Sequence, residues 1–288
     1  MALGTPKVSA MRHRYLVLPS FDIGNAVLAT VSVGFLLFLI ALPLSTIFRR
    51  AGENGLYAFW QTISTPEALF ALRYSLMLAA ATTMLNACMG TVVAYALVFG
   101  NFPFKRLVDS LVDLPMAIPA SVTGFTLLLL YGPLGLLGGP LSGMGIGVMF
   151  AFPGILLAHS FTTFPYVTRA VGPLLEKLDR GQQEAAQTLG AGPIQVFLRV
   201  TLPAIGGGII VGSIFTFARS LGEFGATIMV SGNLALRTQT APLFIFTKFN
   251  QGDIEAASAM SLVLIVLSFI LFFGLKTAAN RFGARSNM

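Results

Sequence analysis

Residues 184–203 read EAAQTLGAGPIQVFLRVTLP, a polar, helix-forming stretch in an otherwise strongly apolar chain. The residues that carry its pattern are Glu184, Ala185, Ala186, Gly190, Leu202 and Pro203. Gly190 can end a helix, because glycine adopts the left-handed conformation at little cost. Pro193 suits the first turn of a following helix, where its missing N–H costs nothing. The stretch predicts two short helices joined by a glycine elbow.

The composition places this stretch in a membrane protein. Of 288 residues 55% are hydrophobic and 10% are charged, and the mean hydropathy is +0.81, which excludes an ordinary soluble domain. The net charge of +7 comes from basic residues spread over many short loops, so it does not indicate nucleic-acid binding. The single cysteine, Cys88, excludes an internal disulfide, and no cluster of metal ligands is expected.

Six apolar stretches are long enough to predict an all-α integral membrane protein with six transmembrane helices. They cover residues 25–48, 75–99, 111–131, 146–168, 204–230 and 256–275. Arg49 and Arg50 follow the first stretch directly, which favours a retained span over a cleaved signal peptide. Pro115 and Pro119 predict a kinked third span. The small-residue spacing of Gly208 and Gly212 predicts close helix packing in the fifth.

The Lys and Arg residues orient these spans. With residues 184–203 inside, the inner segments carry twelve basic residues and the outer loops five. Cytoplasmic loops are enriched in Lys and Arg, so both termini are predicted to be cytoplasmic.

Two charged residues lie within the predicted fifth span. An isolated charge at this depth costs at least about 2.5 kcal/mol, and the four-residue spacing of Arg219 and Glu223 allows them to neutralise one another. Two interpretations stay open, a pair that pins neighbouring helices and a direct role in a transport path. His159, close to several hydroxyl residues, is interpreted as a hydrogen-bonded packing residue.

The chain has no visible means of using ATP. A phosphate-binding loop needs glycines followed by Lys and Ser or Thr, and no Gly-Lys pair occurs. No nucleophile is paired with a base, so a catalytic residue is not predicted and the chain is not expected to be an enzyme. Another subunit would have to supply the nucleotide chemistry.

The pattern in residues 184–203 resembles the cytoplasmic coupling loop of ABC-importer permeases, with Val200 where that family usually has Ile. The resemblance implies the type I ABC-importer permease fold and docking of this loop on an ATPase dimer. ATP and Mg would be used by those partner subunits, with no cofactor bound by this chain.

Residues 217–226 (FARSLGEFGA) resemble the signature of the sulfate and molybdate branch of these permeases. The likeness runs from about residue 69 to 281 and includes Asp113-Leu114-Pro115 and Phe164-Pro165 before Arg169. It implies an N-terminal tail, first span and outer loop in residues 1–68, a permease core in 69–281 with its coupling loop at about 176–203, and a tail in 282–288. The residues expected in a translocation path or gate are Arg219, Ser220, Glu223, Ser121 and Thr123.

The extra first span favours the sulfate permeases, and the T-type subunits most of all. That resemblance implies import of sulfate and thiosulfate, a homologous second permease subunit, an extracytoplasmic sulfate-binding protein and a place in the bacterial inner membrane, surrounded by lipid. A molybdate or tungstate permease is the alternative. An ATP-independent secondary transporter and a membrane-embedded enzyme are further rivals.

Overall fold

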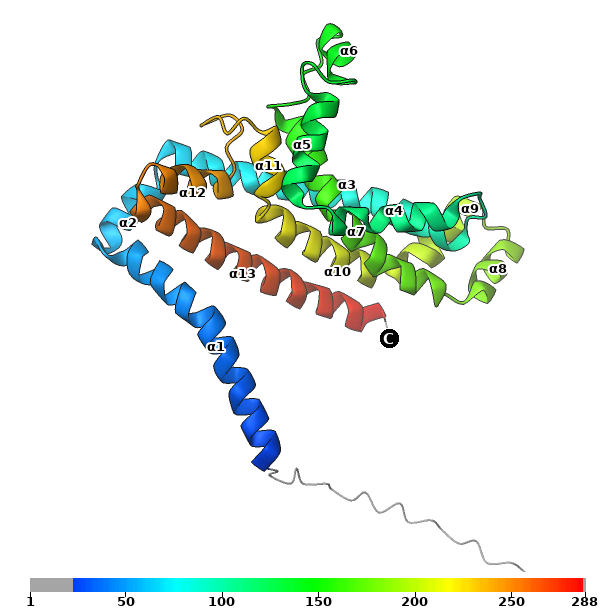
Figure 1. The fold of residues 1–288 in the computed structure, drawn as a ribbon. Coiled ribbons are helices and arrows are strands. Elements are labelled where there is room, and N and C mark those ends of the chain that lie inside the picture. The colour runs from blue at the N-terminus through cyan, green and yellow to red at the C-terminus, as the bar shows by residue number, and fades with distance from the viewer. Residues whose placement is uncertain (1–22, 287–288) are drawn as a thin grey trace, which may run out of the picture. The chain divides into compact units, whose positions relative to one another are not determined.

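The computed structural model describes residues 23–286, and all its regular elements are helices. The chain forms two units, Met1–Thr46 and Ile47–Met288, and each is described by itself. The described part of the first unit, residues 23–46, belongs to helix α1 (Ile23–Gly52; Figure 1). Most apolar side chains in this part are exposed. The division predicted at residue 68 stays a prediction.

The second unit holds the remaining helices. They are α2 (Gly55–Ile63), α3 (Pro66–Phe99), α4 (Lys105–Ala117), α5 (Ala120–Tyr131), α6 (Gly138–Gly143), α7 (Phe152–Glu176), α8 (Arg180–Thr188), α9 (Pro193–Val196), the π-helical segment η1 (Phe197–Thr201), α10 (Leu202–Leu221), α11 (Gly225–Val230), α12 (Ala241–Asn250) and α13 (Ile254–Ser286).

Helices α3, α7 and α10 pack against one another and form the centre of this unit (Figure 1). The small-residue spacing in α10 explains how closely α7 approaches. A Cβ atom at Gly208 would lie 2.7 Å from the backbone oxygen of Ala170, and one at Gly212 would lie 2.6 Å from Val167 Cα. The close packing predicted for these glycines is confirmed, and it fixes α10 against α7.

The predicted third span is two helices. Helices α4 and α5 meet at an angle of 112°, with Pro115 inside α4 and Pro119 capping α5. A residue before proline disfavours the helical conformation, so the chain breaks at Ile118. The start of α5 packs on α11, where a Cβ at Gly124 would lie 2.5 Å from the backbone oxygen of Ala226.

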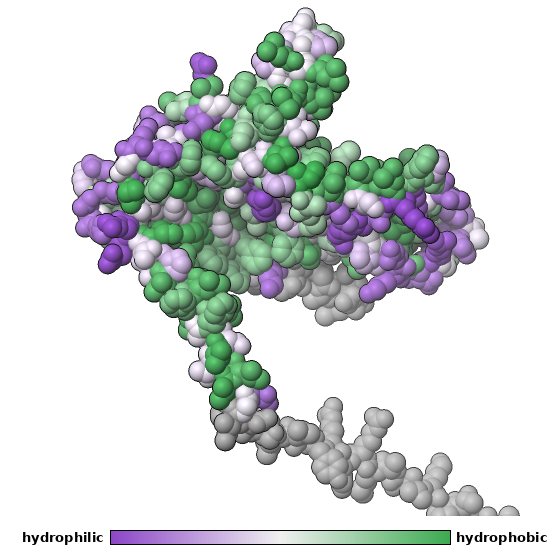
Figure 2. All heavy atoms as spheres, viewed as in Figure 1, coloured by the Kyte–Doolittle hydropathy of each residue, from purple (hydrophilic) through white to green (hydrophobic). Residues whose placement is uncertain are grey.

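The surface of the second unit is divided by polarity. Figure 2 shows hydrophilic residues gathered around α8 and α9 at one end and around α2 and α12 at the other, with hydrophobic residues between them. Within the described residues, four helices are long and apolar enough to cross a membrane, or five if α4 and α5 form one bent span. These features describe a multi-pass membrane protein, and the count of six spans stays a prediction.

The predicted fifth span, residues 204–230, also differs from expectation. Helix α10 ends at Leu221, and α11 begins only at Gly225, so Gly222, Glu223 and Phe224 form a break. Glu223 therefore lies between two helices and not within one. Arg219 lies in the last turn of α10.

Candidate functional site

The glycine elbow of residues 184–203 is present as predicted. Gly190 has a φ of +88° directly after α8, the left-handed region that favours glycine. Its N–H donates to the carbonyl of Gln187 at 2.9 Å, and the N–H of Ala191 donates to that of Ala186 at 3.0 Å. This pair of hydrogen bonds is the Schellman motif, which satisfies the last carbonyls of a helix.

The second helix differs from the short helix expected. From Pro193 to Leu221 the chain is one continuous helix of 29 residues, made of α9, η1 and α10. The wider turn of η1 closes with the N–H of Leu202 bonded to the carbonyl of Phe197. Pro203 has no N–H to offer, and the wider turn before it fits a helix that continues past a proline. The glycine elbow is thereby joined by helix to Arg219.

Helix α8 and the elbow present apolar side chains to the outside. Leu189 is 89% exposed and Ile194 is 74% exposed. Glu184 and Ala185 are exposed too, whereas Ala186 is half-buried. Leu189 and Ile194 are therefore free of contacts that would bury them within the chain and are available to a partner.

A few contacts hold α8 to the helices beneath it. Gln183 Nε2 donates to Thr201 Oγ1 at 3.0 Å, which links α8 to η1. The guanidinium of Arg180 lies 5.6 Å above the ring of Phe99 at the end of α3. Tyr95 of α3 meets Phe197 of η1 edge to face, with ring centroids 5.6 Å apart. The loop is anchored on one side and exposed on the other.

The predicted pair of intramembrane charges is formed. Arg219 Nη1 lies 2.6 Å from Glu223 Oε2. The Glu223 side chain is fully buried, whereas that of Arg219 is 41% exposed. The other carboxylate oxygen, Oε1, accepts a hydrogen bond from the N–H of Ala226 at 2.9 Å. Glu223 thus neutralises Arg219 and at the same time holds the first turn of α11.

His159 joins the two sides of the helix break. Its Nδ1 lies 2.8 Å from Ser220 Oγ at the end of α10, and its Nε2 lies 2.8 Å from Thr227 Oγ1 in α11. The Thr227 hydroxyl also reaches the carbonyl of Glu223, at 3.3 Å. The predicted hydrogen-bonded packing histidine is confirmed. Its partners lie more than 60 residues away in sequence, so the sequence offered no signal for them.

The remaining residues predicted for a path lie in α5. A Cβ at Gly225 would lie 3.2 Å from the N atom of Ser121, so the signature residues and the start of α5 are close together. Ser121 is exposed, whereas Thr123 is 4% exposed and its hydroxyl has no hydrogen-bond partner among the described residues. The Ser220 hydroxyl is buried against His159. The role of each in a path stays a prediction.

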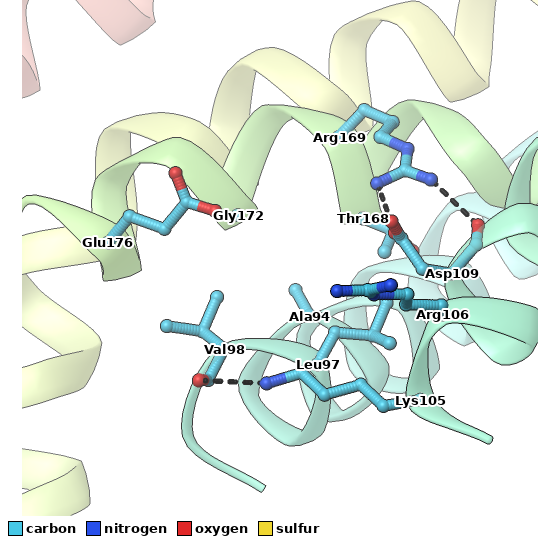
Figure 3. Close-up of a pocket in the computed structure, with 10 residues that line it drawn as sticks. All are labelled: Ala94, Leu97, Val98, Lys105, Arg106, Asp109, Thr168, Arg169, Gly172 and Glu176. Carbon is cyan, nitrogen blue, oxygen red and sulfur yellow. Dashed lines mark hydrogen bonds and ion pairs between the residues drawn. The ribbon is translucent and has the colours of Figure 1, made fainter.

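A further ion-pair cluster was not predicted. Arg169 of α7 contacts Asp113 through two bonds of 2.7 Å, from Nε to Oδ1 and from Nη2 to Oδ2. Its Nη1 also lies 2.6 Å from Asp109 Oδ1, and Figure 3 shows this pair at the edge of a pocket. Asp113 and Arg169 come from two separate stretches of the family likeness, and their contact joins α4 to α7.

Comparison with known proteins gives the family. Residues 86–282 match the family described as "Binding-protein-dependent transport system inner membrane component". The chain belongs to this family. Its resemblance to the sulfate branch of the ABC permeases is confirmed as well. It is 37% identical over 269 residues to the sulfate transport system permease protein CysT of Salmonella typhimurium, covering 93% of this chain and 96% of that protein.

Other relatives agree. Identity is 37% over 269 residues with CysT of Escherichia coli, covering 93% of this chain and 96% of that protein. It is 36% over 243 residues with the sulfate permease CysW of Synechocystis, covering 84% and 88% of the two chains.

Solved structures agree on the fold. The chain superimposes on a bacterial ABC transporter that imports the polysaccharide alginate, with a TM-score of 0.76, 16% identity and coverage of 90% of this chain and 96% of that chain. A structure of a bacterial alginate ABC transporter in complex with a pentasaccharide-bound periplasmic protein gives a TM-score of 0.73, 17% identity and coverage of 90% and 94%. At these identities the likeness concerns the fold alone.

Proposed function

We propose that this chain is the transmembrane permease subunit of an ATP-driven importer of sulfate, and of thiosulfate with it. The observation that carries the proposal is identity of 37% to sulfate permeases over almost the whole of both chains. The built elbow of the coupling loop supports the same function, because its exposed apolar residues offer a docking surface for a partner.

The likeness to both CysT and CysW proteins supports a heterodimer with a homologous permease subunit. An ATPase dimer would dock on the coupling loop and supply ATP and Mg. The alginate-importer complex, which contains a periplasmic protein, supports an extracytoplasmic sulfate-binding protein as the third partner. The assembly would lie in a bacterial inner membrane, with both termini of this chain in the cytoplasm.

The coupling loop would pass the movement of the ATPase dimer to the membrane. ATP closes the dimer, and residues 184–203 move with it. Because Pro193 to Leu221 is one helix, movement at the elbow is carried along the helix to Arg219. The break at Gly222 to Phe224 is where the helix can change direction. Each state of the switch needs its own set of contacts, and the ATPase supplies that difference at the elbow.

Arg219 would act at the gate of the translocation path. Its partly exposed guanidinium offers N–H donors to a tetrahedral oxyanion, whereas the carboxylate of Glu223 is buried behind it. Glu223 would therefore neutralise the arginine in the empty path and not contact the substrate. Ser121, exposed at the start of α5, can offer a further hydroxyl.

The experiment that tests the function is uptake of labelled sulfate in cells with and without this gene, and in cells that lack the ATPase subunit. We expect uptake to need both, and unlabelled thiosulfate to compete. Uptake that persists without the ATPase subunit would favour a secondary transporter. Competition by molybdate at lower concentrations than by sulfate would assign the chain to the molybdate or tungstate permeases.

A further inference from the structure

Two neighbouring pockets lie along α3, α4 and α7, outside the residues assigned above to the path; Glu176, the last residue of α7, is also the first residue of the predicted coupling loop. The first has a volume of about 400 Å³ and contains the charged residues Lys105, Arg106, Asp109, Arg169 and Glu176 (Figure 3). The second has a volume of about 500 Å³ and is lined almost entirely by apolar side chains.

The two pockets follow one another along the same three helices. On α4 the charged pocket takes Lys105 to Asp109, and the apolar pocket takes residues from Val108 to Pro115. On α7 the order matches, with Thr168 to Glu176 in the charged pocket and Leu157 to Phe164 in the apolar one. The charged pocket lies at the predicted cytoplasmic end, and the apolar pocket lies deeper in the membrane. This is the arrangement of a headgroup site above a site for an acyl chain.

The charged side chains of the first pocket differ in whether they have partners within the chain. Arg169 and Asp109 are paired, and Lys105 Nζ donates to the carbonyl of Gly100 at 3.1 Å. The side chains of Arg106 and Glu176, both exposed, make no hydrogen bond or ion pair with another described residue. Figure 3 shows the Arg106 side chain directed into the pocket from α4 and the Glu176 side chain on α7. One pocket therefore presents an unpaired cation and an unpaired anion.

We infer that these pockets bind one membrane phospholipid whose headgroup carries both a phosphate and a primary ammonium, the chemistry of phosphatidylethanolamine. Arg106 binds the phosphate, with the charge of Lys105 beside it. Glu176 accepts the N–H groups of the ammonium. One acyl chain fills the apolar pocket between α3, α4 and α7, beneath the bend between α4 and α5. The lipid stabilises the packing of α4 on α7.

The test uses the full-length chain in detergent, titrated with defined lipids and followed by native mass spectrometry. Phosphatidylethanolamine is compared with phosphatidylglycerol, which lacks the ammonium, and with phosphatidylcholine, whose ammonium has no N–H. We expect saturable binding of one phosphatidylethanolamine in preference to both. Inorganic phosphate at millimolar concentrations should leave the bound lipid in place, because it cannot use the apolar pocket.

Variants separate the parts of the site. Arg106→Gln should weaken binding of both phosphatidylethanolamine and phosphatidylglycerol about 5-fold, while Arg73→Gln, an exposed arginine on α3 outside both pockets, should change neither. Glu176→Gln should weaken phosphatidylethanolamine alone, by up to about 5-fold. Met89→Trp fills the apolar pocket and should abolish binding, whereas Met84→Trp on the exposed side of the same helix should not.

Three results would overturn the inference. Equal binding of the three lipids would indicate a nonspecific lipid shell. Displacement of the lipid by inorganic phosphate would indicate a site for a free anion. Binding to the isolated chain but not to the assembled transporter would show that a partner subunit covers these pockets. None of these results bears on sulfate uptake, so the inference and the proposed function can fail separately.

Discussion

The coupling loop and the polar centre lie at the two ends of one continuous helix, Pro193 to Leu221, but they are built in opposite ways. At the elbow, Leu189 and Ile194 are exposed, and few contacts hold α8 in place. At the other end, Glu223, Ser220 and Thr227 are at most 1% exposed, and each has a polar partner. The side chains at one end of the helix are exposed and can contact another protein, whereas those at the other end are buried and bonded to residues of the same chain.

This difference separates stability from coupling. Substitutions at the polar centre remove partners from groups that water cannot reach, so they should destabilise the chain itself. Substitutions at the elbow change an exposed surface or a local backbone conformation, so the chain should stay folded. They should instead change the affinity for the ATPase subunit or the coupling of ATP hydrolysis to uptake. Four variants test this separation, from the largest expected effect on stability to the smallest.

The largest effect is expected from Arg219→Ala. It leaves the buried carboxylate of Glu223 without its ion pair, which costs up to about 3–5 kcal/mol for a fully buried pair; the partial exposure of Arg219 places the expected cost toward the lower end of this range. We expect the free energy of unfolding in detergent to fall by this amount, measured from the loss of helical ellipticity. The double variant Arg219→Ala/Glu223→Ala should recover part of the loss. Unchanged unfolding of the single variant would contradict the assigned pair.

A smaller effect is expected from His159→Leu. The substitution leaves the buried hydroxyl of Ser220 without a partner, whereas Thr227 keeps its bond to the carbonyl of Glu223, so the cost is about 1–3 kcal/mol. Two further variants sharpen the test. His159→Asn can keep the contact near Nδ1 and His159→Gln the contact near Nε2, so each should lose less stability than His159→Leu in the same unfolding measurement. If all three unfold alike, the two contacts do not stabilise the break.

The sequence predicts the elbow better than the polar centre, because the elbow depends on residues that are neighbours in the sequence and the polar centre depends on residues that are far apart in it. Gly190 in the left-handed conformation, Pro193 at a helix start and the bend at Pro119 depend on a few neighbouring residues. The bridge from His159 to Ser220 and Thr227 depends on how α7 packs on α10 and α11. No local pattern contains that information, although the polar type of His159 in an apolar stretch did indicate that it must find partners.

Two predicted helix boundaries were wrong because short sequence patterns did not indicate how the helix continues or breaks. The helix after the glycine elbow was predicted to be short, but the wider turn of η1 lets it continue past Pro203 into α10. Residues 204–230 read as one span because they are almost uniformly apolar, and Gly222 alone gives only a weak signal for a break. The buried contacts of Glu223 with Arg219 and Ala226 hold this break open.

The elbow itself is tested by Gly190→Val. A side chain at this position meets no atom within 4 Å, but the left-handed conformation costs about 1–2 kcal/mol for a residue with a Cβ. We expect the chain to remain folded in the membrane while ATP hydrolysis by the assembled transporter no longer drives sulfate uptake. Gly192→Ser is the matched control, since Gly192 has a φ of −70° and serine is a good helix cap. Normal uptake by Gly190→Val would contradict a role for the elbow in coupling.

The smallest effect on stability is expected from Leu189→Ala. Leu189 is 89% exposed, so its truncation should change the free energy of unfolding by no more than about 0.5 kcal/mol. If the ATPase subunit covers this side chain, its affinity for the permease should still fall, and a loss of 1–2 kcal/mol corresponds to about 5- to 30-fold. Co-purification and titration of the ATPase subunit measure this change.

Leu134→Ala is the control for that comparison. Leu134 is also fully exposed, but it lies in the loop between α5 and α6, on the predicted outer side of the membrane. It should change neither the unfolding nor the affinity for the ATPase subunit. Equal loss of affinity in both variants would mean that the exposed leucines act through general solubility. A loss confined to Leu189→Ala would show that a residue with almost no contacts inside the chain is kept apolar for the subunit that docks on it.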